Sequence, residues 1–160
     1  MPKVAVRFTL NGSEAAEFVE SATPLITVLR DKLGETSVKA GCLQGTCGAC
    51  SVIIDGTLKL TCLTLAETCE GAHIETVAAL TTNGTLHPLQ RAFVEHFATQ
   101  CGFCTSGMIM AAKALLDRNP TPSREDVIDA ISGNICRCTG YEPIIQAILA
   151  ASRAARPTAS

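Results

Sequence analysis

Apolar residues occupy alternate positions near the start of the chain, namely Val4, Val6, Phe8 and Leu10. A period of two residues is typical of a strand that buries one face. The Asn11-Gly12 pair that follows favours a tight hairpin turn and predicts a second strand over residues 15–19. The chain is therefore expected to begin with a β-hairpin.

The pattern then predicts a helix and another hairpin. Thr23 and Pro24 are typical of a helix start and Gly34 of a helix end, so a helix is expected over residues 25–33. Residues 51–63 divide into two short apolar segments around an Asp-Gly turn, which predicts an antiparallel hairpin. The order strand, strand, helix, strand, strand indicates a β-grasp arrangement for this half.

In the second half, apolar residues recur with the spacing of helices instead of strands. Four helices are predicted, over residues 88–97, 105–118, 125–131 and 143–155. The third of them is preceded by a capping-box pattern from Ser123 to Asp126, a signal for a helix N-terminus. We expect this half to form a compact four-helix arrangement.

Composition adds information about partners. The 160 residues are enough for two small domains, and an apolar content of 47% with a mean hydropathy of +0.27 is high for a chain of this length. Small domains leave much of their surface exposed, so the apolar surplus favours faces that partner subunits cover. The formal net charge is −2 and no run of Lys and Arg occurs, so no nucleic-acid partner is expected.

The sequence also bears on location. Residues 1–12 contain neither the apolar segment of a signal peptide nor a twin arginine. The best apolar run, from Met108 to Leu116, is short and is interrupted by Lys113, so no membrane span is expected. These features favour a cytoplasmic protein.

Eight of the nine cysteines fall into two groups of four. The first group is Cys42, Cys47, Cys50 and Cys62. The second group is Cys101, Cys104, Cys136 and Cys138. In the first group, four residues and then two separate the first three members, and the fourth lies downstream, which is the plant-type [2Fe–2S] spacing. These groups predict two [2Fe–2S] clusters on this chain and a function in electron transfer.

The residues around both groups suit an anionic cluster. Gly41, Gly45 and Gly48 lie among the first three cysteines, and glycine permits the positive φ and close backbone approach that wrapping a cluster requires. The members of the second group precede two predicted helices, whose N-termini favour negative charge. The surroundings therefore agree with the spacing.

Other interpretations use fewer of the cysteines. A zinc site usually draws its ligands from two short Cys-x-x-Cys-like knuckles, which the spacing of the first group fits poorly. Disulfides are rare where thiols are kept reduced, as expected for a chain without an export signal. A thioredoxin-type pair of Cys47 and Cys50 would leave Cys42 and Cys62 idle. Cys69 has no partner group and is expected to be a small packed thiol. The histidines lack the spacing of a Rieske site or a haem attachment site.

Three stretches resemble one known family. GCLQGTCGACSV, followed by TC, resembles the [2Fe–2S] ferredoxin domain of the molybdenum hydroxylases, the xanthine oxidase family. QCGFCTSGMIM and GNICRCTGY resemble the second-cluster domain of the same family. The resemblance implies an α+β fold, with an N-terminal β-grasp plant-type ferredoxin domain over residues 1–80. A C-terminal four-helix iron–sulfur domain would follow over residues 81–160.

The resemblance also implies partners. The chain would be the small electron-transfer subunit of an oxidoreductase complex, with no substrate chemistry of its own. A large subunit would carry molybdenum on a pterin dinucleotide, and a medium subunit would carry FAD. The complex would be a hetero-oligomer, with a dimer of heterotrimers as one arrangement. Electrons would pass from molybdenum through the second cluster and then the first to FAD or another acceptor.

The resemblance assigns two residues to the molybdenum side. Cys138 corresponds to the ligand that approaches the pterin, and Gln100 corresponds to a glutamine near the same cofactor. Leu43, Gln44 and Thr46 depart from the glycine or acidic residues common in the family's first loop, which is expected to alter hydrogen bonding to the sulfurs.

Three other functions stay open at this stage. The first is a free-standing two-cluster carrier resembling ferredoxin, and the second is a structural zinc protein that acts as an interaction module. The third is a cysteine redox sensor, which leaves the fourfold grouping unexplained.

Overall fold

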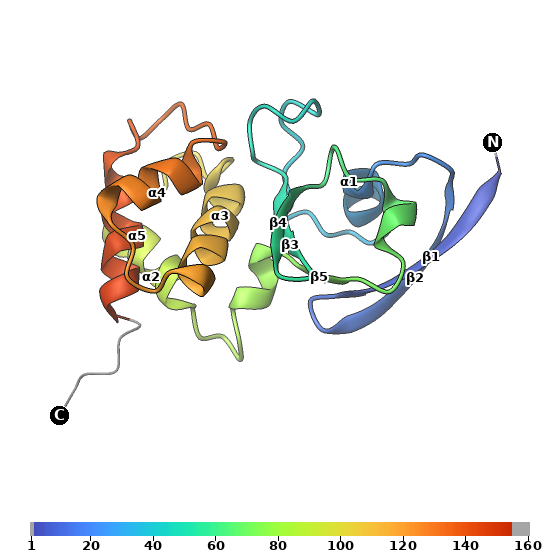
Figure 1. Ribbon diagram of the computed structural model, residues 1–160, viewed down its shortest axis with the longest axis horizontal. Coiled ribbons are helices and arrows are strands. Elements are labelled where there is room, and N and C mark those ends of the chain that lie inside the picture. Colours follow the sequence, from blue (N-terminus) through green and yellow to red (C-terminus); the bar gives the residue numbers. More distant parts are fainter. Residues whose placement is uncertain (1, 155–160) are drawn as a thin grey trace.

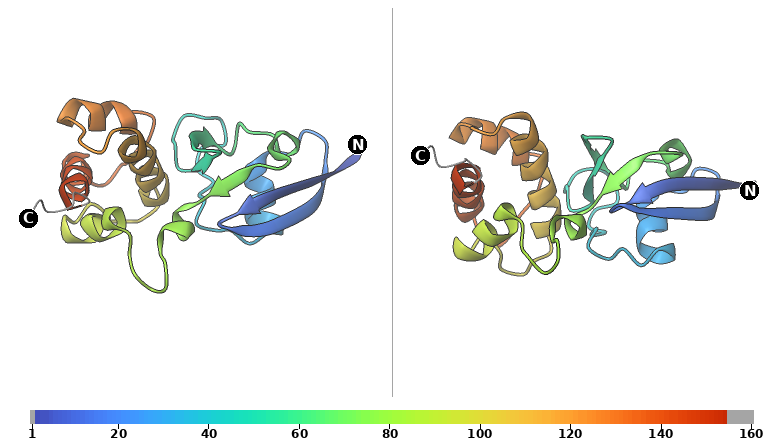
Figure 2. Two further views of the ribbon diagram at one scale, coloured as in Figure 1. Left: turned by 60° about the horizontal axis from the view of Figure 1, so that its bottom comes forward. Right: turned by 90° about the horizontal axis from the view of Figure 1, so that it is seen from below.

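The structure is a computed structural model that describes residues 2–154. A strand-rich half and a helical half lie side by side, each with its own apolar core (Figure 1). The Cα traces meet along the helix α3 (Thr105–Arg118) and the strand β3 (Ser51–Ile54), as the rotated views also show (Figure 2). The chain therefore combines a five-stranded sheet with helices in a mixed α and β fold.

The first half is built on one sheet. Its five strands are β1 (Lys3–Leu10), β2 (Ser13–Glu20), β3 (Ser51–Ile54), β4 (Thr57–Leu60) and β5 (His73–Glu75). Their order across the sheet is β2-β1-β5-β3-β4. The two hairpins that the sequence predicts, β1 with β2 and β3 with β4, are confirmed as antiparallel pairs.

The central strand β5 is missing from the prediction. It pairs in parallel with β1, where Thr9 lies opposite His73, and antiparallel with β3, where Ile53 lies opposite Glu75. With three residues it is too short to show a period of two, so its place in the sheet comes from tertiary pairing. This strand joins the two hairpins into a single sheet.

The helix predicted over residues 25–33 is present with a different geometry. It begins as α1 (Leu25–Thr27) and continues as the π-helical turn η1 (Val28–Lys32). Thr23-Pro24 predicts Thr23 as the N-cap with Pro24 as the first helical residue, and this is wrong: Pro24 is the N-cap residue, and the Thr23 hydroxyl donates to the Glu20 carbonyl at 2.6 Å. Gly34 follows with a φ of 70°, a conformation that glycine adopts without strain.

The second half contains α2 (Pro88–Glu95), α3, α4 (Arg124–Ile131) and α5 (Glu142–Ala154). All four predicted helices are present: α3 has the predicted bounds, and the described ends of the other three differ from the prediction by at most two residues. Residue 155, the predicted end of the last helix, lies outside the described residues. Two further short helices, η2 (Ala66–Cys69) and η3 (Val77–Leu80), precede them. Within residues 2–154, none of the helices combines the length and the apolar character that a membrane crossing requires.

The capping box of α4 is confirmed. Ser123 N–H donates to the carboxylate of Asp126 at 2.8 Å, and Asp126 N–H donates to the hydroxyl of Ser123 at 3.1 Å. These bonds satisfy two of the backbone donors that a helix start leaves free. An ion pair between Arg124 and Glu142, 2.6 Å between the nearest nitrogen and oxygen, then ties the start of α4 to the start of α5.

The helix α3 connects the two halves. One face of it joins the core of the helical half, where Met108 and Ala112 are fully buried. Another face presents Met110 and Ala114 to Ile53 of β3, in a small apolar cluster of its own. Because α3 is buried on both sides, the sheet and the helices are packed together without relying on the connecting chain.

Candidate metal centres

The first cysteine group lies in the loop between η1 and β3. Backbone N–H groups of this loop point at its sulfurs: Gln44 and Thr46 donate to Cys42 Sγ at 3.4 and 3.3 Å, and Cys42 donates to Cys47 Sγ at 3.4 Å. The Thr46 hydroxyl and these N–H groups lower the pKa of Cys42 to about 5. The loop therefore favours the thiolate that binds metals. The residues that depart from the family pattern, Gln44 and Thr46, supply two of these donors.

Two glycines of the loop lie close to neighbouring side chains. Gly45 has a φ of 83°, and a Cβ there would lie 2.4 Å from Leu63 Cδ1. A Cβ at Gly41 would lie 2.9 Å from Cys47 Sγ. The predicted positive φ is present at Gly45 but not at Gly41, and a larger residue at either position would require the side chain of Leu63 or Cys47 to move.

The hairpin of β3 and β4 returns the chain to this loop. Cys50 immediately precedes β3, and Cys62 follows β4. Burial raises the pKa of Cys62 to about 11, and the neighbouring Cys50 side chain adds to the effect. Cys50 and Cys62 are thus close neighbours, and Cys42 contacts Cys47 through its N–H, so folding brings the members of the first group together.

The members of the second group lie at the start of α3, for Cys101 and Cys104, and in the segment before α5, for Cys136 and Cys138. Cys104 is the N-cap residue of α3, and burial together with Cys136 raises its pKa to about 12. The N–H of Phe103 and the side chain of Cys138 lower the pKa of Cys101, while Cys101 raises that of Cys138. This group consists of two pairs, an outer pair of exposed cysteines and an inner pair.

The inner cysteine of the last segment has two further contacts. Burial opposes ionisation of Cys136, but hydrogen bonds from Thr139, Cys138 and Cys104 together outweigh it, and the pKa of Cys136 is lowered. The Thr139 hydroxyl lies 3.2 Å from Cys136 Sγ, and Cys136 N–H donates to the Tyr141 hydroxyl at 2.9 Å. Thr139 and Tyr141 could not be identified from the sequence, since neither belongs to a ligand spacing.

Chain segments next to the two groups are in contact at a seam between the halves of the molecule. Ile135 N–H donates to the carbonyl of Cys47 at 2.9 Å, and the buried side chain of Asn134 donates to the carbonyl of Gly48 at 3.0 Å. A Cβ on Gly107 would lie 2.2 Å from that same Gly48 oxygen. We call these five residues the seam. Its hydrogen bonds connect the first loop to the two residues before Cys136.

The donor set fits iron–sulfur clusters. Each group offers four thiol side chains, and a [2Fe–2S] cluster takes four thiolates shared between two irons. Among residues 2–154, no three His, Cys, Asp or Glu side chains converge on one point closely enough to hold a single metal ion. A two-iron cluster would be held by the four thiolates of one group together and would not require three of them to converge on one metal ion.

The ninth cysteine belongs to neither group. Cys69 is buried in the core of the sheet half, and its sulfur lies 3.7 Å from the carbonyl of Leu65. Burial raises the pKa of its thiol. The prediction of a small packed thiol is confirmed. Gln100, placed near a partner's cofactor by the resemblance, is exposed next to Cys101.

Known proteins resemble this chain over most of its length. A family model described as "2Fe-2S iron-sulfur cluster binding domain" matches residues 7–96, and one described as "[2Fe-2S] binding domain" matches residues 76–149. The nicotine 6-hydroxylase small subunit of Paenarthrobacter nicotinovorans is 46% identical over 147 residues, covering 92% of this chain and 88% of the relative. The xanthine dehydrogenase iron-sulfur-binding subunit of Escherichia coli O157:H7 is 40% identical, covering 91% and 92%.

A solved structure agrees with these relatives. The crystal structure of quinoline 2-oxidoreductase from Pseudomonas putida 86 matches with a TM-score of 0.91 and 46% identity, over 95% of each chain. Fold and cysteine groups define a protein that binds [2Fe–2S] clusters and transfers electrons. More particularly, the chain belongs to the small iron–sulfur subunits of the molybdenum hydroxylase, or xanthine oxidase, family.

Membership of this family decides between the functions left open by the sequence. Its relatives are named as subunits of hydroxylases and dehydrogenases, which favours a subunit of an oxidoreductase complex over a free-standing carrier. The family models favour iron–sulfur clusters over zinc.

Proposed function

We propose that this chain carries electrons between two partner subunits by holding one [2Fe–2S] cluster in each cysteine group. The first group, Cys42, Cys47, Cys50 and Cys62, would hold the cluster of a β-grasp ferredoxin domain, residues 1–80. The second group, Cys101, Cys104, Cys136 and Cys138, would hold the cluster of a four-helix domain, residues 81–160. When bound, each cluster supplies a one-electron redox centre.

The observation that carries this proposal is the hydrogen bond between Ile135 and Cys47. The donor is the backbone N–H of the residue before Cys136, and the acceptor is the carbonyl of Cys47, at 2.9 Å. Covalent bonds and this one hydrogen bond therefore connect Cys47, in the first group, to Cys136, in the second. The connection is short, belongs to the backbone and does not depend on a side-chain rotamer.

The exposed ends of the two groups support a direction for the relay. Cys101 and Cys138 are exposed, and so is the adjacent Gln100, so this end is accessible to a large subunit with a molybdenum pterin. At the other group, Leu43 and Leu63 are 58% and 63% exposed. Exposed leucines beside a redox site suit a contact with a second partner, which we infer is an FAD-binding subunit.

The proposed assembly is a hetero-oligomer of this chain with the molybdenum-binding and FAD-binding subunits, as a dimer of heterotrimers. Relatives named as small, beta or gamma subunits support a multi-subunit assembly. The substrate chemistry would take place on the large subunit.

The first test is chemical. Iron, acid-labile sulfide and zinc are measured per chain in the purified complex, with EPR spectra of the reduced protein. Iron and sulfide sufficient for two [2Fe–2S] clusters, and two distinct signals, are the expected result. Zinc without labile sulfide would contradict the proposal, and a single cluster would contradict it for one half of the chain.

The second test concerns the order of the relay. In the Cys138→Ser variant, substrate should no longer reduce the cluster of the first group at the wild-type rate, while that cluster still assembles. Cys69→Ser is the matched control, because it also removes one thiol but from neither group. Wild-type reduction in the Cys138→Ser variant would refute the proposed order.

A further inference from the structure

The segment between Cys136 and α5 contacts Cys136 in a way that metal ligation alone does not require. Thr139 Oγ1 lies 3.2 Å from Cys136 Sγ. Among residues 2–154, Cys136 is the one cysteine of the second group whose sulfur has a side-chain hydroxyl within hydrogen-bond distance. Thr139 therefore singles out one of the four sulfurs.

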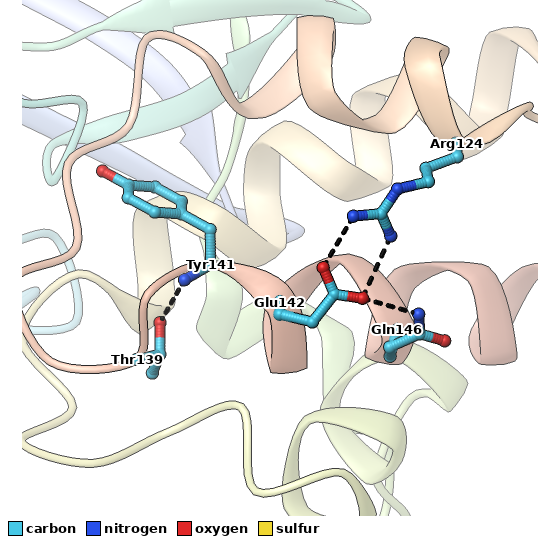
Figure 3. Close-up of polar contacts among 5 residues, drawn as sticks. All are labelled: Arg124, Thr139, Tyr141, Glu142 and Gln146. Atoms are coloured by element: carbon cyan, nitrogen blue, oxygen red, sulfur yellow. Dashed lines mark hydrogen bonds and ion pairs between the residues drawn. The ribbon is translucent and has the colours of Figure 1, made fainter.

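The direction of this hydrogen bond follows from its neighbours. Tyr141 N–H donates to Thr139 Oγ1 at 3.1 Å, as the dashed line in Figure 3 shows. The hydroxyl oxygen thus accepts one bond and keeps its own proton available to donate. A cysteine that binds iron is a thiolate without a proton, so in the loaded protein the Thr139 hydroxyl is the donor to Cys136 Sγ.

The hydroxyl is held in place by the turn around it. Gly140 and Tyr141 have φ values of 67° and 71°, and Cys136 N–H donates back to the Tyr141 hydroxyl at 2.9 Å. Glu142, the next residue, starts α5 and forms a two-pronged ion pair with Arg124 at 2.6 and 3.1 Å (Figure 3). The turn is therefore fixed to α4 at one end and to Cys136 at the other.

We propose that Thr139 is a positioning residue that raises the reduction potential of the cluster held by the second group. The reduced state carries one more negative charge than the oxidised state, and a donor to a ligand sulfur stabilises the more negative state. Thr139 supplies that donor without being a ligand. This inference rests on the proposed function, since it requires a cluster on the second group.

The test compares Thr139→Val with Thr139→Ser in the purified complex. Valine keeps the shape of threonine and removes the hydroxyl, whereas serine keeps the hydroxyl. Midpoint potentials of both clusters are measured by EPR-monitored redox titration. We expect Thr139→Val to lower the reduced-to-oxidised ratio of the second cluster about tenfold at a given potential, a negative shift of ~59 mV for a one-electron couple. Thr139→Ser and the first cluster should stay at their wild-type potentials.

The outcomes separate this inference from the proposed function. Absence of a second cluster from the wild-type complex, by iron, sulfide and EPR, would refute the proposed function itself. A wild-type complex with both clusters and an unshifted potential in loaded Thr139→Val would overturn only the inference. If the valine variant does not load, Thr139→Ala is titrated instead. If Thr139→Val and Thr139→Ala both lose the second cluster while Thr139→Ser keeps it, Thr139 is a structural residue, and this result would also overturn the inference.

Discussion

A single methyl group at Gly107 should disturb the seam between the two halves. Gly107 lies in the first turn of α3 and faces the loop of the first cysteine group. The Cβ of Gly107→Ala would lie 2.2 Å from the carbonyl oxygen of Gly48, and 3.1 Å from both Ala49 Cα and Asn134 Nδ2. The nearest of these atoms belong to the backbone, so no rotamer change relieves the contact.

The cost can be estimated from the size of the displacement. A Cβ atom essentially never lies within 3.0 Å of such a neighbour. The distance from the new Cβ to the Gly48 oxygen must therefore grow from 2.2 to at least 3.0 Å, which requires α3 and the loop to move apart. Overpacking of this kind costs about 1–3 kcal/mol. The strained hydrogen bond from Asn134 to Gly48 costs about 1 kcal/mol more, and the higher helix propensity of alanine returns about 1 kcal/mol. A net loss of about 1–3 kcal/mol is expected.

Thermal unfolding of the full cluster-bearing chain tests this estimate. Each kcal/mol should lower the midpoint by about 2–4 °C in a chain of this size, followed by far-UV circular dichroism at one scan rate. Gly133→Ala is the control, because a Cβ at Gly133 has no atom within 4 Å. Equal midpoints for wild type, Gly107→Ala and Gly133→Ala would refute the role of the seam in stability.

Three further predictions concern other contacts. Asn134→Ala removes one of the three hydrogen bonds that the Gly48 carbonyl accepts, the other two coming from Ser51, and should cost about 1 kcal/mol in thermal unfolding; an unchanged midpoint would contradict this. Cys69→Ala should cost about 1 kcal/mol in denaturant unfolding and leave the iron content unchanged, whereas loss of iron would show that Cys69 is a ligand. Arg124 holds the pKa of Glu142 at about 2, below its ordinary 4.5. The ion pair therefore stabilises the fold above about pH 4.5, and its contribution fades as the pH falls towards 2. The midpoint difference between wild type and Glu142→Gln should shrink over that window; an equal difference at both ends would disprove the assignment.

Elements with strong local signals were predictable from the sequence. Alternation and turn residues located both hairpins, and the capping box at Ser123 located the start of α4. The failures have physical causes. The strand β5 has three residues, and its pairing with β1 and β3 is visible only in three dimensions. The π-helical turn in η1 carries no composition signal that distinguishes it from an α-helix.

The residues of the candidate site also divide into those that local sequence predicts and those that only the fold reveals. Ligand spacing in the first group is local, so Cys42, Cys47 and Cys50 could be proposed directly from the sequence. Residues that contact the ligands or their loop could not be proposed from the sequence. Asn134 contacts Gly48 across the seam, at a separation of 86 residues, and no pattern near Asn134 signals that partner. Thr139 lies three residues from Cys136, but its hydrogen bond depends on a turn in which Tyr141 has a positive φ.

The relative position of the two cysteine groups is set by the seam and not by the connecting chain. Residues 81–86, which lead from the sheet to the helices, are exposed along their whole length, and their turn contains two residues with positive φ, Asn83 and Gly84. A segment of this kind fixes little geometry. The seam instead combines two hydrogen bonds with a glycine contact that admits no side chain. Electron transfer between the groups requires a constant separation. The backbone hydrogen bond from Ile135 to Cys47 and the close approach of Gly107 to Gly48 contribute to it without depending on a side-chain rotamer.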